Sequence, residues 1–262
     1  MIHKEFLRQL KNVERISAGT SGILKPKTMH RLRSAILRLA ILLKYTRNGK
    51  AVNVGRRLMK FRRATAYRRD CDVCWSRIRN ELHTSGLGKK ARRRIKRSID
   101  AQKRKAQREM EHKLMARKFR KLLLSIHDHI DDLGKIDVNA VHHENIIYQS
   151  PNQWEPGQFH QIRKRLRIIN YVHDLLLGKE ETEDQKDNDN WILRYQNVLG
   201  DYIDGSNTVG ILRRLKKVKR SQIERLINKE TAKMQKCRWL IKSMPWPDTV
   251  SFSRTAFQES YL

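Results

Sequence analysis

The sequence predicts an all-helical protein, and composition and periodicity carry that prediction. Good helix formers such as Leu, Ile, Arg, Lys, Glu and Gln are abundant, whereas only 5 prolines interrupt 262 residues. No stretch shows the alternation of apolar and polar residues that is typical of a strand. A repeated phrase further predicts that the helices are divided between two related halves.

The repeated phrase occurs at 29–36 and again at 159–166, which is 130 positions later. Each copy reads apolar, His, any residue, Leu or Ile, Arg, two further residues, and Ile or Leu. A match at about half the chain length indicates an internal duplication. We therefore expect both halves to contribute equivalent residues to whatever the protein binds.

The first half is predicted to contain four helical segments that end at Gly, Pro or Asn signals. In chain order they cover about 3–16, 28–46, 52–83 and 89–130. The third segment is expected to be kinked. The fourth is expected to break near residue 112, because its early part is highly charged and its apolar positions gather later.

The second half is expected to follow an irregular stretch at 133–157, which Gly and Pro residues mark as a boundary. Four helices are predicted beyond it, at about 158–177, 190–204, 207–216 and 219–243. The acidic run at 180–187 is interpreted as a solvated loop. The tail beyond Pro245 is expected to be loosely attached.

The charge balance points to a polyanionic partner. Lys and Arg number 58 against 27 Asp and Glu, for a formal net charge of +31. A field of this size attracts nucleic acid, polyphosphate or an anionic surface. The most apolar segment, 35–45, is too short to span a bilayer and contains Arg38. With no apolar signal core at the N-terminus, we expect a cytoplasmic protein without membrane insertion.

The cysteines point to no cofactor. Cys71 and Cys74 form a CxxC motif, but no second pair accompanies it, and three cysteines cannot all pair within one chain. Two reduced cysteines on a helix is the favoured interpretation, with zinc or redox chemistry as the alternative. We predict neither a metal site nor catalytic residues.

Helical projection of the two repeat copies places a basic face beside an apolar one in each. The cations recur about once per turn, which suits a row of phosphates better than one small anion. The candidate binding residues on these faces are His30, Arg33 and Lys44 in the first copy, and His160, Arg163 and Arg167 in the second. Leu37 stands where the second copy has Arg167, so the second face is the denser one.

Four motifs, taken in order, resemble those of the CHAD proteins, the conserved histidine α-helical domains. They are the His-x-[Leu/Ile]-Arg phrase, Arg-Asp-x-Asp-Val at 69–73, a basic, aromatic and Leu-rich helix at 117–124, and Gln-x-x-Leu-Gly-x-x-x-Asp at 196–204. The resemblance covers about 25–243. It adds Arg69, Arg120 and Lys121 to the candidate polyphosphate-binding residues.

The resemblance implies two pseudo-symmetric antiparallel four-helix lobes around a basic central groove or channel. The implied boundaries are an extension at 1–24, a CHAD domain at 25–243 with lobes at about 25–132 and 157–243, and a tail at 244–262. Asp70, Asp72 and Asp204 are interpreted as structural, capping a helix or pairing with arginine inside a lobe.

The function implied is non-enzymatic binding of inorganic polyphosphate, with association with polyphosphate granules as in some family members. An RNA- or DNA-binding protein is the nearest alternative, although aromatic residues make up only 7% of the chain and few lie inside the basic runs. A metal-dependent phosphohydrolase is a second alternative, which normally requires carboxylates for the metal. A scaffold that docks an acidic protein or a membrane surface is a third.

Overall fold

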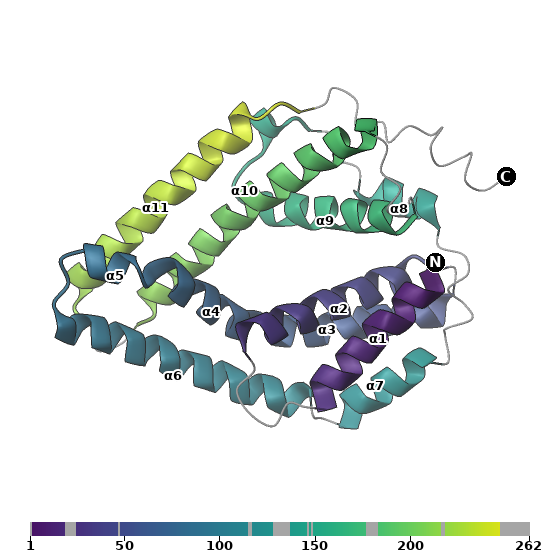
Figure 1. Cartoon of the computed structure of the whole chain (residues 1–262), viewed down its shortest axis with the longest axis horizontal. Coiled ribbons are helices and arrows are strands. Elements are labelled where there is room, and N and C mark those ends of the chain that lie inside the picture. The colour runs from purple at the N-terminus through teal and green to yellow at the C-terminus, as the bar shows by residue number, and fades with distance from the viewer. Residues whose placement is uncertain are drawn as a thin grey trace.

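The computed structural model describes residues 2–18, 25–46, 48–114, 117–127, 137–145, 147, 149–176, 183–215 and 218–246. Within these ranges the chain is helical and forms no strand, which confirms the all-α prediction (Figure 1). The first-half helices are α1 (Ile2–Ala18), α2 (Pro26–Lys44), α3 (Gly49–Ala64), α4 (Ala66–Ile78), α5 (Glu81–Thr84), α6 (Lys89–Leu114) and α7 (Arg117–His127). Then follow α8 (Val138–Asn145), a 3₁₀ turn (Pro151–Gln153), α9 (Phe159–Leu176), α10 (Glu183–Arg213) and α11 (Arg220–Ser243).

Local signals explain several of these boundaries. Pro26 opens α2, where its fixed φ suits the first turn of a helix. Asn48 caps α3, because its side-chain oxygen accepts hydrogen bonds from the backbone nitrogens of Lys50 at 2.8 Å and Ala51 at 3.3 Å. The fourth segment is described as two helices, α6 ending at Leu114 and α7 beginning at Arg117, close to the predicted division.

The predicted break near residue 205 is wrong, because α10 runs without interruption from Glu183 to Arg213. Gly205 is a packing residue here and not a helix breaker. A Cβ at this position would come within 2.8 Å of Met234 on α11, so glycine allows the two helices to approach closely. The acidic run is also helical from Glu183 onward, while its residues 180–182 lie outside the described part of the chain.

The buried apolar side chains form three clusters, and two of them combine residues from both halves of the sequence. The first joins α1, α2, α3 and α7 with one face of α9. The second joins α4, α5 and α6 with the C-terminal part of α10 and the start of α11. The third is built from α9, α10 and the end of α11.

The predicted N-terminal extension contributes to the first cluster. Phe6, Leu10 and Val13 of α1 are fully buried in it, beside Leu32 and Ile36 of α2. The predicted duplication, the two four-helix lobes, the central groove and the domain boundaries stay predictions.

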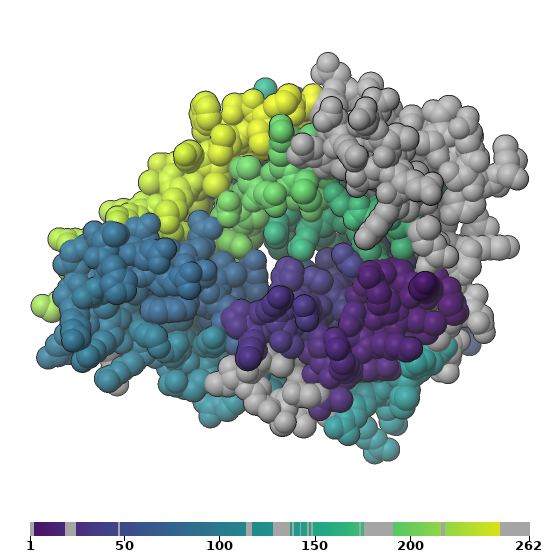
Figure 2. All heavy atoms as spheres, in the orientation of Figure 1, coloured from purple at the N-terminus to yellow at the C-terminus, as the bar shows by residue number. Residues whose placement is uncertain are grey.

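The two halves meet across the middle of the molecule. In the space-filling view, the green segment of α10 faces the purple and blue segments of α2 and α4 (Figure 2).

In the described part of the chain, no helix is long and apolar enough to cross a bilayer.

Candidate anion-binding site

Helices from both halves bring basic side chains to one region between α2, α3, α4 and α9. His30 has Arg33, Arg69 and Arg167 as electrostatic neighbours, and Arg62 has Arg33, Arg69, Arg163 and Arg167. His160 and Lys164 belong to the same group, because Arg62 acts on both of them. We call this group the cationic cluster: His30, Arg33, Arg62, Arg69, His160, Arg163, Lys164 and Arg167.

Burial, and then repulsion among its members, makes the charged state of the cationic cluster less favourable than in water. Burial, followed by repulsion from neighbouring arginines, lowers the pKa of Arg62 from 12.5 to about 9. Burial also lowers the pKa of Arg33 and of Arg163 to about 10. A bound anion would relieve this repulsion, because an opposite charge within a few ångströms favours the charged form of each side chain.

Each repeat arginine is held by the helix that follows it. Arg33 donates to the Arg62 carbonyl at 3.0 Å and to the Thr65 hydroxyl at 2.7 Å. Arg163 donates to the Gln196 carbonyl at 3.2 Å. Arg62 stands eight positions before Asp70, and Gln196 stands eight positions before Asp204, so the two arginines use corresponding carbonyls.

The Gln-x-x-Leu-Gly motif on α10 positions Arg163. Gln196 donates from its amide to the Leu166 carbonyl on α9 at 3.2 Å, which links the two helices. Gly200 lies directly beneath the guanidinium, because a Cβ there would be 2.9 Å from one of its nitrogens. The motif therefore lets Arg163 lie flat across α10.

Two aspartates act as counter-ions within the site. Arg69 donates two hydrogen bonds to the Asp204 carboxylate, at 2.6 and 2.8 Å, and one to Asp70 at 3.2 Å. The predicted pairing with arginine is thereby confirmed: Asp70 pairs with Arg69 and Asp72 with Arg68 within α4. The pair of Arg69 with Asp204 instead joins α4 to α10, because these two helices pack together. Burial raises the pKa of Asp70 despite the neighbouring arginine.

One donor of the cationic cluster is unsatisfied. Among the described residues, the buried Nε of Arg62 has no hydrogen-bond partner. Buried polar atoms almost always have one, so this donor is available to an anion that enters the cationic cluster.

Three predicted site residues lie elsewhere. Lys44 pairs with Glu144 and lies 4.5 Å from the centre of the Tyr45 ring, at the edge of the cationic cluster beside Lys164. Arg120 and Lys121 are exposed on α7. In the described ranges neither of them is an electrostatic neighbour of a cluster residue.

Sequence reasoning missed Arg62 and Lys164. Arg62 is one of several basic residues on α3, and only its place eight positions before Asp70 relates it to the second half. Lys164 directly follows Arg163 and lies just outside the basic face of the helical projection. Its position beside Arg62 and Lys44 is a consequence of packing.

The CxxC cysteines are buried on α4. Burial raises the pKa of Cys71 to about 11 and that of Cys74 to about 12, so both remain thiols, the unreactive form of the side chain. Across the described ranges, no three His, Cys, Asp or Glu side chains are grouped so as to hold a metal ion.

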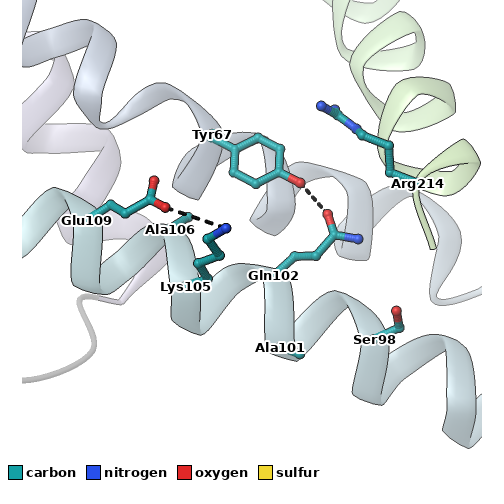
Figure 3. A pocket seen from close by; sticks show the side chains of 8 residues that line it. All are labelled: Tyr67, Ser98, Ala101, Gln102, Lys105, Ala106, Glu109 and Arg214. Carbon is teal, nitrogen blue, oxygen red and sulfur yellow. Dashed lines mark hydrogen bonds and ion pairs between the residues drawn. The ribbon is translucent and has the colours of Figure 1, made fainter. Parts of the chain in front are cut away.

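A pocket of about 480 Å³ lies outside the cationic cluster, between α4, α6 and the end of α10. Figure 3 shows its lining: Tyr67, Ser98, Ala101, Gln102, Lys105, Ala106, Glu109 and Arg214. Tyr67 donates to Gln102, and the guanidinium of Arg214 lies 5.3 Å from the Tyr67 ring centre. None of the predicted site residues lines it.

Comparison with known proteins shows which family the sequence matches and which structures share its fold. Residues 4–213 match the family model of the CHAD domain. The fold is similar to that of PptA from Streptomyces chartreusis, with a TM-score of 0.65 and 13% identity over 92% of this chain and 93% of that one. It is also similar to the CHAD domain from the plant Ricinus communis, with a TM-score of 0.68 and 11% identity over 93% and 91% of the two chains.

No curated protein matches the sequence. At these identities the structural matches show the fold alone. The family model, however, spans well over half of the sequence, and the matched range includes the arginines of the cationic cluster and the aspartates that pair with Arg69. The chain belongs to the CHAD domain family.

Proposed function

We propose that the cationic cluster binds inorganic polyphosphate and that the protein is a binding module, not an enzyme. The observation that carries the proposal is the convergence of arginines from both halves, in which the buried Nε of Arg62 has no hydrogen-bond partner among the described residues. The family resemblance supports the same ligand. Association with polyphosphate granules would be a cellular consequence of such binding.

The distribution of the cations favours a linear polyanion. They come from α2, α3, α4 and α9 and extend toward Lys164 and Lys44, so they are not gathered around one point. Arginine presents a planar fork of donors to phosphate oxygens, and successive phosphates of one chain can each contact a different side chain.

The aromatic residues argue against single-stranded RNA as the ligand of this site. Base stacking requires exposed rings near the basic groups. The rings of Trp154, Trp191, Tyr195 and Trp246 instead pack on one another with centroids 5.0 to 6.1 Å apart, in the apolar cluster of α9, α10 and α11.

The carboxylates support binding without hydrolysis. Asp70 and Asp204 both accept hydrogen bonds from Arg69, so they neutralise an arginine within the site. A metal-dependent phosphohydrolase would use such oxygens as metal ligands.

Calorimetric titration with polyphosphate of defined length tests the proposal. We expect the triple variant Arg62→Gln, Arg163→Gln and Arg167→Gln to lose at least about tenfold in affinity, because charge-assisted hydrogen bonds are lost. The matched control carries Arg57→Gln, Arg194→Gln and Arg213→Gln, at exposed positions on α3 and α10. It lowers the net charge equally and should bind nearly as the natural protein does.

Two outcomes would contradict the proposal. Displacement of polyphosphate by single-stranded RNA at equal phosphate concentration would show that the site does not prefer polyphosphate. Release of orthophosphate in the presence of magnesium or manganese, abolished in the triple variant, would show an enzyme.

A further inference from the structure

Helix α6 carries a second basic surface on the opposite side of α4 from the cationic cluster. Exposed cations recur along its outer side at helical spacing, and we call them the outer ridge: Lys90, Arg93, Arg97, Arg104 and Arg108. At 100° per residue they share one face, opposite the buried stripe formed by Ala91, Ile95, Ile99, Ala106 and Met110. From Lys90 to Arg108 the outer ridge spans ~27 Å.

Several cations beside the outer ridge have partners, whereas those of the outer ridge have none among the described residues. Lys96 pairs with Asp100 at 2.9 Å, and Lys103 pairs with Asp72 of α4 at 2.6 Å. Lys105 lies 4.0 Å from Glu109. Within the described chain, no ion pair or side-chain hydrogen bond involves a residue of the outer ridge.

The spacing of the outer ridge is unfavourable for the helix by itself. Arg93 and Arg97 are four residues apart, as are Arg104 and Arg108. Like charges at this spacing repel each other and destabilise a helix. A polyanion along the outer ridge would convert each repulsion into an attraction.

Helix α4 separates the outer ridge from the cationic cluster. Arg68 and Asp72 of α4 contact Gln107 and Lys103 of α6. The adjacent Arg69 contacts Asp204 of α10 on the other side. Figure 1 accordingly shows α6 along an outer edge of the molecule. The five side chains of the outer ridge are exposed there.

The chemistry of α6 selects among the possible polyanions. Its sequence contains no aromatic residue, so it offers no platform for the bases of a single strand. A membrane-bound helix inserts exposed apolar side chains. The large exposed apolar residues of the described chain, Leu124, Leu193 and Trp239, lie on other helices.

A duplex fits both the charge and the shape of this surface. A helix is ~10–12 Å across with its side chains, which matches a major groove ~12 Å wide and lined by two rows of phosphates. Arginine and lysine side chains that contact only phosphates give affinity without sequence preference.

We propose that the outer ridge of α6 binds double-stranded nucleic acid through its phosphate backbone, at a site distinct from the cationic cluster. This proposal does not depend on polyphosphate being the ligand of the cationic cluster.

Fluorescence anisotropy with a labelled, mixed-sequence DNA duplex tests the proposal on the full chain. The ridge variant combines Arg93→Gln, Arg97→Gln, Arg104→Gln and Arg108→Gln. We expect it to lose at least about tenfold in duplex affinity, and the slope of log K against log salt to become shallower by about 3. Glutamine has a helix propensity close to that of arginine, so thermal unfolding should show no loss of stability.

The matched control combines Arg57→Gln, Arg79→Gln, Arg194→Gln and Arg213→Gln, which are exposed positions on other elements. It removes the same charge and should retain duplex affinity within about threefold. An equal loss in this control, unchanged binding by the ridge variant, or no duplex binding by the natural protein would overturn the proposal.

Further binding measurements distinguish the outer ridge from the cationic cluster and the duplex from other ligands. The cluster variant, with Arg62→Gln, Arg163→Gln and Arg167→Gln, should keep its duplex affinity, and the ridge variant should keep its affinity for polyphosphate. A duplex RNA of the same length should bind more weakly, because the major groove of an A-form helix is deep and too narrow to admit α6. Loss of duplex binding in the cluster variant would overturn the proposal, as would ridge-dependent binding of phosphatidylserine vesicles without duplex binding.

Discussion

At the scale of single residues, the most informative side chain is Arg62, which the sequence did not distinguish. Its guanidinium is surrounded by Arg33, Arg69, Arg163 and Arg167, and its buried Nε has no partner in the described part of the chain. A buried donor without a partner is expected to lower the stability of the free protein, and a bound anion would supply the partner. Stability and affinity should therefore change in opposite directions when it is replaced.

Replacement of Arg62 by methionine tests this opposition. We expect Arg62→Met to raise the free energy of unfolding of the ligand-free protein by ~1 kcal/mol, because a buried unpaired donor is removed. Polyphosphate affinity should fall by about tenfold at the same time. Denaturant unfolding and calorimetry measure the two effects. Arg57→Met, at an exposed position on the same helix, should leave both the free energy of unfolding and the polyphosphate affinity unchanged. A lower free energy of unfolding for Arg62→Met would contradict the interpretation.

The two repeat histidines should make the proposed binding of polyphosphate depend on pH. Burial and neighbouring arginines lower the pKa of both His30 and His160 below 6.5 in the free protein. The folded state then binds fewer protons than the unfolded state, so the histidine contribution to stability is lost as pH falls below about 6.5 and through the lowered pKa. Bound phosphates reverse this preference by favouring the imidazolium form.

We therefore expect polyphosphate affinity to rise as the pH falls from about 8 to about 6, with protons taken up on binding. Calorimetry in buffers of different ionisation enthalpy measures that uptake. The double variant His30→Gln and His160→Gln should bind with little dependence on pH in this range. Proton release by the natural protein, or equal uptake by the double variant, would count against a role for the histidines.

At the scale of elements, α10 shows how a short motif serves a side chain on another helix. Gln196 accepts from Arg163 with its carbonyl and donates to α9 with its amide, while Gly200 leaves room for the guanidinium. Glycine inside a helix is unfavourable by ~1 kcal/mol relative to alanine. Its presence here is explained by the position of Arg163.

The variant Gly200→Ala should separate the effect of this glycine on helix stability from its effect on the position of Arg163. The added Cβ would lie 2.9 Å from the guanidinium of Arg163 and displace this flexible group from the Gln196 carbonyl. We expect an unchanged or higher melting temperature with polyphosphate affinity lowered about threefold to tenfold, since one charged contact is misplaced. The control is Gly210→Ala on the same helix, where the nearest atom belongs to Arg214 at 3.7 Å. It should gain stability and keep its affinity.

At the scale of the whole molecule, a net charge of +31 opposes the compact state. Part of this charge is concentrated in two places, the cationic cluster and the outer ridge of α6, which together hold 11 of the 58 Lys and Arg residues. Few carboxylates balance them, and those of the centre are already engaged by Arg69.

Salt should therefore act oppositely on stability and on binding. Raising NaCl from about 50 mM to about 500 mM shortens the Debye length from ~14 Å to ~4 Å. We expect the melting temperature of the free protein to rise, and the further rise produced by polyphosphate to shrink. Differential scanning calorimetry measures both. The melting temperature of the Arg62→Met variant should rise less with salt. A melting temperature of the free protein that falls with salt would show that charge repulsion does not limit its stability.

The sequence by itself determined the helical class, the two basic faces and the positions of the four motifs. These features depend on composition and on residues within a few turns of each other, so local periodicity is sufficient to find them. It also identified His30, Arg33, Arg69, His160, Arg163 and Arg167, all of which the structure brings into one cluster.

Only the tertiary structure decided which basic residues share that cluster. Packing of α4 against α10 joins Arg69 to Asp204 across 135 positions, and Arg62 enters from α3, whereas Arg120 and Lys121 remain outside on α7. Packing also keeps α10 continuous through Gly205, which the sequence pattern suggested as a break. The physical reason is the same in each case. Charge proximity and close helix approach depend on contacts between distant segments, and no local pattern encodes them.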